Sequence, residues 1–282
     1  MTNAGERRTP PADGQQGPRS DVVVAIDGPA GSGKSTVARA VAARTGLRYL
    51  DTGSTYRAMT LALVRRGTPV DDPEAVADAV REVRIALELD AEPGAASRVL
   101  LDGEPVGSEL RSAKVNASVS PVSAVPAVRE RLVALQRSVM ELGGVVAEGR
   151  DVGTAVCPQA DVKVFLTASA AERARRRGNA TGPGDAPWVV ESAEEVARRD
   201  QIDSSRAASP TRASPDAVVV DSTDRPIDDV VDQIVGLVEA LVPQLFTFIG
   251  SELSLAMALA IIVIVLLVRP QGIFGTKRIE RV

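Results

Sequence analysis

Short apolar runs alternate with amphipathic stretches along most of the chain. The apolar runs are rich in β-branched residues and have the length of buried parallel strands; they lie at 22–26, 48–50, 145–147, 162–166 and 217–220. Apolar positions at helical spacing, with caps at several ends, predict helices at 34–45, 54–66, 71–83, 127–142, from 170, at 192–205 and at 226–241. Strands that alternate with helices favour a parallel sheet covered on both faces, so we predict an α/β fold.

One segment breaks this rhythm. Residues Arg84–Leu89 alternate between apolar and polar side chains, a Gly-Ala loop follows, and Val99–Leu101 leads into an Asp102-Gly103 turn. Alternation joined by a tight Asp-Gly turn is typical of a β-hairpin. We therefore predict a small antiparallel insertion at about 84–106.

Composition removes several classes of function. The net charge of −4 gives no global attraction to nucleic acid, so no nucleic-acid partner is expected. The chain has no histidine, which excludes His-based triads, His general bases and most zinc sites. The single cysteine, Cys157, cannot form an intramolecular disulfide and fits a reducing compartment. Residues 1–20 lack an apolar run and are predicted to be a disordered leader.

A phosphate-binding motif lies between the first predicted strand and the first predicted helix. Its residues are Gly28-Pro29-Ala30-Gly31-Ser32-Gly33-Lys34-Ser35, followed by Thr36, and they match G-x-x-x-x-G-K-[ST]. Glycines let backbone N–H groups curl around phosphates, and the helix N-terminus adds positive potential. Lys34 would reach the β- and γ-phosphates of ATP, and Ser35 would bind Mg²⁺. The motif does not identify the second substrate.

Several separated blocks resemble the bacterial cytidylate kinase family, in that family's order, over residues 21–242. The blocks are Ile26-Asp27-Gly28-Pro29, Asp51-Thr52-Gly53-Ser54-Thr55-Tyr56-Arg57, Glu148-Gly149-Arg150-Asp151-Val152-Gly153-Thr154 and Asp203-Ser204-Ser205-Arg206. The resemblance implies a P-loop nucleoside monophosphate kinase with a five-stranded parallel sheet flanked by helices and a small antiparallel insertion. It also implies a cytoplasmic, monomeric enzyme that moves the γ-phosphate of ATP to CMP or dCMP.

The resemblance further implies which residues bind the acceptor. Thr52 and Arg57 would hold its phosphate side, with Arg129 and Arg150 as further clamps. The family often has serine where this chain has Thr52, a change that keeps the hydroxyl. Phosphoryl transfer depends on positioning and charge neutralisation, and planar arginine forks suit phosphate oxygens.

The nucleoside end of the acceptor would be recognised by other residues. Ser120, Asp203 and Arg206 would contact the cytosine and ribose, and Asp151 would help to organise the site. Asp161 follows a turn rather than ending a strand, so we predict that Mg²⁺ is held by Ser35, phosphates and water without a protein carboxylate.

An arginine-rich segment resembles the mobile lid of these kinases, at about 173–190. A lid that closes over ATP excludes water and prevents hydrolysis. At least two of Arg173, Arg175, Arg176 and Arg177 are expected to be ordinary solvated arginines. The predicted catalytic side chains are Lys34, Arg150, Asp151, Arg173 and Arg177.

Other functions stay open at this stage. UMP, AMP or shikimate could be the acceptor, although the blocks at 51–57 and 148–154 favour CMP. A GTPase is disfavoured because the chain has no Asn-Lys-x-Asp motif. A membrane-associated fusion protein is the alternative from a different class, and it depends on the C-terminal segment alone.

That segment, 243–282, does not fit the kinase pattern. Residues 253–268 are apolar except for Ser254, and the run approaches the roughly 20 residues that span a bilayer. Residues from about 254 resemble the C-terminal end of branched-chain amino acid ABC transporter permeases, especially Arg269–Gly275. The basic flank favours a cytoplasmic C-terminus, which would place the kinase outside, away from ATP. We therefore favour a fusion, frameshift or gene-model origin over a tail anchor, with a buried core helix as a third option.

Overall fold

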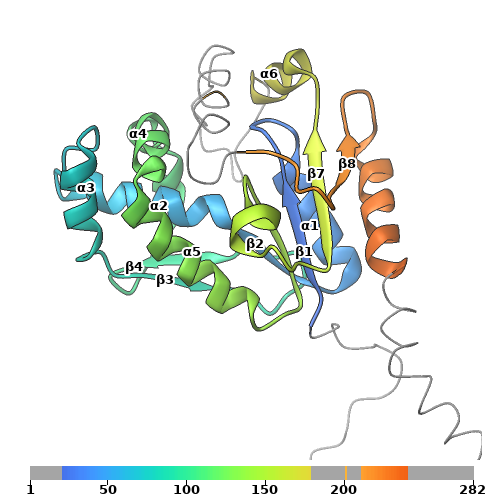
Figure 1. Cartoon of the computed structure of the whole chain (residues 1–282), viewed down its shortest axis with the longest axis horizontal. Helices are drawn as coiled ribbons and strands as arrows, with labels where there is room; N and C mark the ends of the chain where they lie inside the picture. Colours follow the sequence, from blue (N-terminus) through green and yellow to red (C-terminus); the bar gives the residue numbers. More distant parts are fainter. Residues whose placement is uncertain (1–20, 179–200, 202–210, 241–282) are drawn as a thin grey trace, which may run out of the picture. The chain divides into compact units, whose positions relative to one another are not determined.

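The computed structural model describes residues 21–178, 201 and 211–240 (Figure 1). The chain divides into two compact units, Met1–Val235 and Gly236–Val282, and residues 236–240 of the second unit are helical. The predicted leader at 1–20, most of the predicted helix at 192–205 and the tail at 243–282 lie outside the described residues. Within the described ranges, no helix is both long enough and apolar enough to cross a membrane.

A five-stranded parallel sheet forms the centre of the first unit. Its strands stand in the order β2-β6-β1-β7-β8, and every neighbouring pair is parallel. They are β1 Val23–Asp27, β2 Arg48–Asp51, β6 Val145–Gly149, β7 Val162–Thr167 and β8 Val218–Asp221. The prediction of a five-stranded parallel sheet is confirmed. In such sheets ligands bind beyond the carboxyl ends of the strands.

Helices follow the strands as the periodicity predicts, with one addition. They are α1 Lys34–Thr45, α2 Thr52–Arg65, α3 Pro73–Val80, α4 Ala113–Ala124, α5 Pro126–Met140, α6 Ala170–Gly178 and a helix at 227–240. The sequence did not predict α4, because Pro121 lies inside it and its apolar positions are interrupted by serines. Tertiary packing outweighs these weak local preferences.

The predicted insertion is a separate antiparallel sheet of three strands. Its strands are β3 Ile85–Glu88, β4 Arg98–Leu101 and β5 Glu104–Val106, in the order β3-β4-β5. Asp102 and Gly103 form the tight turn with positive φ angles of 51° and 89°. Val99 and Leu101 pack into the same core as residues of α2, α3, α4 and α5. This core lies to one side of the parallel sheet (Figure 1).

A second core packs against the central sheet. Ala25 and Ala147, on neighbouring strands, share it with Met140 of α5 and Val156 of the π-helical turn Val152–Val156. Helix α1 packs against β1, β2 and β6. The loop between β1 and α1 is therefore fixed at both ends by buried secondary structure.

Candidate active site

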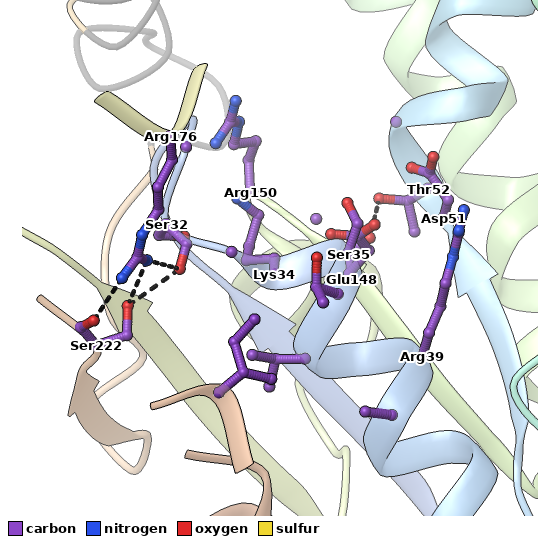
Figure 2. Close-up of a pocket in the computed structure, with 18 of the residues that line it drawn as sticks. Ser32, Lys34, Ser35, Arg39, Asp51, Thr52, Glu148, Arg150, Arg176 and Ser222 are labelled. Carbon is purple, nitrogen blue, oxygen red and sulfur yellow. Dashed lines mark hydrogen bonds between the residues drawn. The ribbon is translucent and has the colours of Figure 1, made fainter. Parts of the chain in front are cut away.

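A cleft of about 1600 Å³ is lined by residues at or just beyond the carboxyl ends of β1, β2, β6 and β8. The β1–α1 loop and the start of α1 form its floor, and the turn after β6 continues that floor (Figure 2). Residues of α2, α4 and α5 line one end, and α6 and the turn after β8 line the other. The cleft is therefore built from segments distant in the sequence.

The β1–α1 loop adopts a backbone that depends on glycine. Gly28, Gly31 and Gly33 have φ angles of 153°, 77° and 91°. A Cβ atom at Gly28 would stand 2.0 Å from the carbonyl oxygen of Leu166, and one at Gly31 would stand 2.7 Å from that of Arg173. Gly33 is the N-cap of α1, whose first N–H groups have no acceptor within the helix. This arrangement suits a bound phosphate.

Cationic side chains hydrogen-bond to the carbonyl groups of the same loop. Lys34 Nζ donates to the Pro29 carbonyl at 2.7 Å, and Arg150 donates to that of Gly28 at 2.7 Å. Arg173 donates to the Ala30 carbonyl at 3.2 Å. These contacts gather positive charge around the loop from α1, α6 and the turn after β6, which favours a polyanionic ligand.

Glu148 is a functional candidate to which the sequence analysis gave no role. It is the last residue but one of β6, is only 4% exposed, and accepts hydrogen bonds from the hydroxyls of Tyr49 and Ser35. Burial raises the pKa of Glu148, as does the charge of Asp51, whereas Lys34 and the two hydroxyls lower it. Its side chain lies beside Ser35 (Figure 2).

The available signal for Glu148 was its place directly after the apolar run 145–147. The carboxylate of Asp161, just before β7, accepts the Val23 N–H at 2.8 Å. β6, which carries Glu148, is the strand next to β1. The Glu148 carboxylate can therefore reach a metal ion bound by Ser35. Ser35 and Glu148 together offer Mg²⁺ a hydroxyl and a carboxylate, whereas the sequence analysis predicted no protein carboxylate there.

Asp27 is a buried carboxylate that fixes the turn after β6. Its two oxygens accept the backbone N–H groups of Val152 at 2.8 Å and Gly153 at 2.7 Å. Burial raises the pKa of Asp27 to about 6, and the charge of Asp151 adds to the increase, although both N–H bonds and Lys34 oppose it. Asp27 thereby anchors the turn that carries Arg150 and Asp151.

The other end of the cleft holds the predicted acceptor residues of α2. Thr52 begins α2, is buried, and donates its hydroxyl hydrogen to the Glu148 carbonyl at 2.7 Å. Arg57 donates to the carbonyl of Leu110 at 3.1 Å and to the Asn116 side chain. Both residues line the cleft.

A buried ion pair lies at the same end. Arg129 of α5 is 6% exposed and donates to the Asp151 carboxylate, which is 5% exposed. Its guanidinium also lies 5.5 Å from the centre of the Tyr56 ring. Ser120 of α4 is also buried, and it lines the same cleft. The sequence did not predict that Arg129 and Asp151 would neutralise each other.

Most of the predicted site residues therefore meet in one cleft. Lining it are Gly31, Ser32, Gly33, Lys34, Ser35, Thr36, Thr52, Arg57, Ser120, Arg129, Arg150 and Asp151. Gly28, Pro29 and Ala30 complete the loop behind it, and Arg173 contacts that loop. Arg177 belongs to α6, but the structure does not describe its side chain. Asp203, Arg206 and the predicted lid beyond residue 178 lie outside the described residues.

A glycine-rich phosphate loop at the carboxyl edge of a parallel sheet, facing arginines across a cleft, defines the class of P-loop kinases. The chain belongs to the cytidylate kinase family, because that family's model, "Cytidylate kinase", matches residues 24–240. The predicted enzyme class, a nucleoside monophosphate kinase, is thereby confirmed. The match ends close to the predicted domain boundary at 242.

Relatives from several bacteria are similar over almost their full length. The chain is 51% identical to the cytidylate kinase of Rhodococcus opacus (strain B4), over 76% of this chain and 93% of that protein. It is also 51% identical to the cytidylate kinase of Mycolicibacterium paratuberculosis, over 78% and 96% of the two chains. Among solved structures, TT1252 from Thermus thermophilus aligns with 79% of this chain and 98% of its own, at 21% identity and a TM-score of 0.42.

Proposed function

We propose that the chain transfers the γ-phosphate of ATP to CMP or dCMP, giving ADP and CDP or dCDP. One observation carries the proposal: the phosphate loop and the acceptor residues of α2, α4 and α5 line a single cleft. Transfer requires the two substrates in line within one site, and such a cleft can hold both. The membership in the cytidylate kinase family supports cytidine as the acceptor nucleoside.

ATP would bind with its phosphates on residues 28–36. Backbone N–H groups of the loop and the N-terminus of α1 would hold the β-phosphate, and Lys34 would leave the Pro29 carbonyl to reach the transferred group. Because the acceptor residues occupy one end of the cleft, the nucleoside of ATP would lie at the other end, between α6 and the turn after β8. Arg173 and Arg177 would neutralise charge that develops on the transferred phosphoryl group.

Mg²⁺ would be held by the Ser35 hydroxyl, with Glu148 beside it and the remaining ligands from phosphates and water. When bound, the ion neutralises phosphate charge and aligns the β- and γ-oxygens. The raised pKa of Glu148 reflects a carboxylate buried beside Asp51, and a nearby divalent cation would stabilise its ionised form. Glu148 would therefore contribute more to the binding of Mg²⁺·ATP than to the stability of the ligand-free protein.

CMP would lie with its phosphate toward Thr52, Arg57 and Arg150. Arg129 would act through its pair with Asp151, because a neutralised pair offers a hydrogen-bond donor and acceptor without net charge. That combination suits the polar edge of cytosine, together with Ser120. Asp203 and Arg206 are also proposed to contact CMP; both lie outside the described residues.

The cellular setting and assembly follow from the same chemistry. A kinase that consumes ATP and carries one cysteine, Cys157, fits the cytoplasm. Residues of one chain line both ends of the cleft, which supports a monomeric enzyme. Size-exclusion chromatography with light scattering tests the monomer: an active species at about 30 kDa supports it, and an obligate dimer contradicts it.

The direct test is an ADP-release assay on the full chain with CMP, dCMP, UMP and AMP as separate acceptors and Mg²⁺·ATP as donor. We expect turnover with CMP or dCMP to exceed that with UMP and AMP by at least about tenfold, because a pocket built to hydrogen-bond one base leaves polar groups unpaired with another. Turnover confined to UMP or AMP would retain the kinase and overturn the acceptor. ADP release without any acceptor would indicate hydrolysis rather than transfer.

A further inference from the structure

Arg176 of α6 connects three segments at the end of the cleft opposite the acceptor residues. Its NH1 group donates to the Ser32 carbonyl at 3.3 Å and to the Ser222 hydroxyl at 3.0 Å. Its NH2 group donates to the Ser222 carbonyl at 2.6 Å, and its Nε donates to Glu172 at 2.8 Å. Figure 2 shows this guanidinium between Ser32 and Ser222. One side chain thus joins the phosphate loop, α6 and the turn after β8.

Ser222 is the other centre of this network. It follows β8, is buried, and its hydroxyl lies 3.2 Å from the Ser32 carbonyl and 3.0 Å from that of Thr167. Its backbone N–H donates to the same Thr167 carbonyl at 2.9 Å. The turn after β8 is therefore tied to the end of β7 and, through Arg176, to the phosphate loop.

These contacts bear on the part of the cleft where the nucleoside of ATP would lie. Thr223, Asp224 and Ile227 line that end immediately after Ser222. The pairing of β1 with β7 and of β7 with β8 brings the phosphate loop and this turn to neighbouring strand ends. The side chains of Arg176 and Ser222 then join the loop and the turn directly. A planar guanidinium with donors in a fixed fork can set the spacing between them, whereas an ammonium group cannot.

We propose that Arg176 is a positioning residue for the donor nucleotide: it fixes the distance between the phosphate loop and the turn after β8, so that phosphates and nucleoside are bound together. The proposal rests on the proposed function only in assigning this end of the cleft to ATP. Arg176 does not touch the reacting atoms; it acts through Ser32 and Ser222. Its loss weakens ATP binding and leaves CMP binding unchanged.

The same helix offers a matched control. Arg175 has the same chemistry and also donates to Glu172, through two bonds of 2.7 Å. Its side chain is 65% exposed, whereas that of Arg176 is 26% exposed. Among the described residues its hydrogen bonds go to Glu172 alone. Arg175→Ala therefore removes an arginine from α6 without removing the connection.

The experiment is calorimetric titration of the full chain with Mg²⁺·ATP, and separately with CMP, for Arg176→Ala, Arg176→Lys, Ser222→Ala and Arg175→Ala. We expect Arg176→Ala to raise the Kd of ATP about tenfold or more, since it removes several charge-assisted hydrogen bonds. Arg176→Lys should recover little of this loss. Ser222→Ala should raise the Kd about threefold, because the Ser222 carbonyl remains. The Kd of CMP should stay within twofold in every variant.

Two results would overturn the proposal. In the first, Arg176→Ala binds ATP as tightly as Arg175→Ala does. In the second, Arg176→Ala weakens ATP and CMP equally, which would indicate a general structural role. If Arg176→Ala does not fold, the same test applies to Arg176→Lys and Ser222→Ala: the Kd of ATP should rise while the Kd of CMP stays unchanged. Failure of the proposed function would give a different result. A wild-type chain that binds ATP but does not phosphorylate CMP would contradict the proposed function, and the ATP titrations would still test the role of Arg176.

Discussion

The two ends of the cleft recognise their ligands in different ways. The phosphate loop at 28–36 is one continuous segment, and it presents backbone groups whose geometry is set by Gly28, Gly31 and Gly33. The acceptor end presents side chains from three helices and the turn after β6, including Thr52, Arg129 and Asp151. A backbone cradle is encoded locally, whereas a side-chain site exists only after distant segments have packed together. The predicted effects of mutation follow this division.

The largest effect should come from the local end. Lys34→Ala removes the cation that reaches the transferred phosphate, and we expect kcat for CMP phosphorylation to fall about 10⁴-fold with little change in the free energy of unfolding. Steady-state ADP release and chemical unfolding measure the two quantities. Lys114→Ala, at an exposed position of α4, is the matched control and should retain full activity. A fall of less than about tenfold for Lys34→Ala would contradict its catalytic role.

At the acceptor end, mutation should cost stability as well as binding. Arg129→Ala leaves the Asp151 carboxylate buried without its ion partner, so we expect a loss of about 3–5 kcal/mol in the free energy of unfolding and a raised KM for CMP. Urea unfolding and acceptor titration provide the measurements. The double variant Arg129→Met with Asp151→Leu should be more stable than Arg129→Ala, yet still bind CMP poorly. Equal stability of wild type and Arg129→Ala would rule out an energetically important pair.

The pH dependence tests Asp27, the buried carboxylate that fixes the turn after β6. Because the folded-state pKa of Asp27 is raised to about 6, its stabilising contribution is complete below about pH 4 and is lost as the pH rises through about 6. We expect this group to lower the free energy of unfolding by up to about 3 kcal/mol across that window. Asp27→Asn is neutral at every pH, so its free energy of unfolding should change less between pH 4 and pH 7 than that of the wild type. An unchanged slope between pH 4 and pH 7 would show that Asp27 does not titrate there.

The smallest effect should follow removal of the C-terminal segment. A chain ending at residue 242 keeps the whole range matched by the family and every described residue that lines the cleft. We expect kcat and both KM values to stay within about twofold of the full chain, as for a change remote from the site. Parallel ADP-release assays in detergent-free buffer check this. Loss of activity from a folded truncated chain would show that 243–282 contributes to the kinase.

Most of the strands and helices could be predicted from periodicity, and the features that were not predicted have specific physical causes. The central strands and α1 follow from buried β-branched runs and from capping glycines, which act over a few residues. Helix α4 was missed because Pro121 and interspersed serines hide its apolar face, which is defined by packing against α2 and α5. The place of Glu148 after the apolar run 145–147 indicates the end of a strand, but its proximity to Ser35 depends on the pairing of β6 with β1, which is not a local property.

The sequence by itself determined the phosphate loop, the central strands and most of the helices, the insertion and the family. These features depend on short-range patterns, because glycine geometry, apolar periodicity and motif spacing are local properties. Only the tertiary structure decided that Arg129 pairs with Asp151, that Glu148 lies beside Ser35, and that Arg176 joins Ser32 to Ser222. Such contacts depend on the relative placement of segments far apart in the chain, and that placement is set by burial of a common core rather than by any local signal.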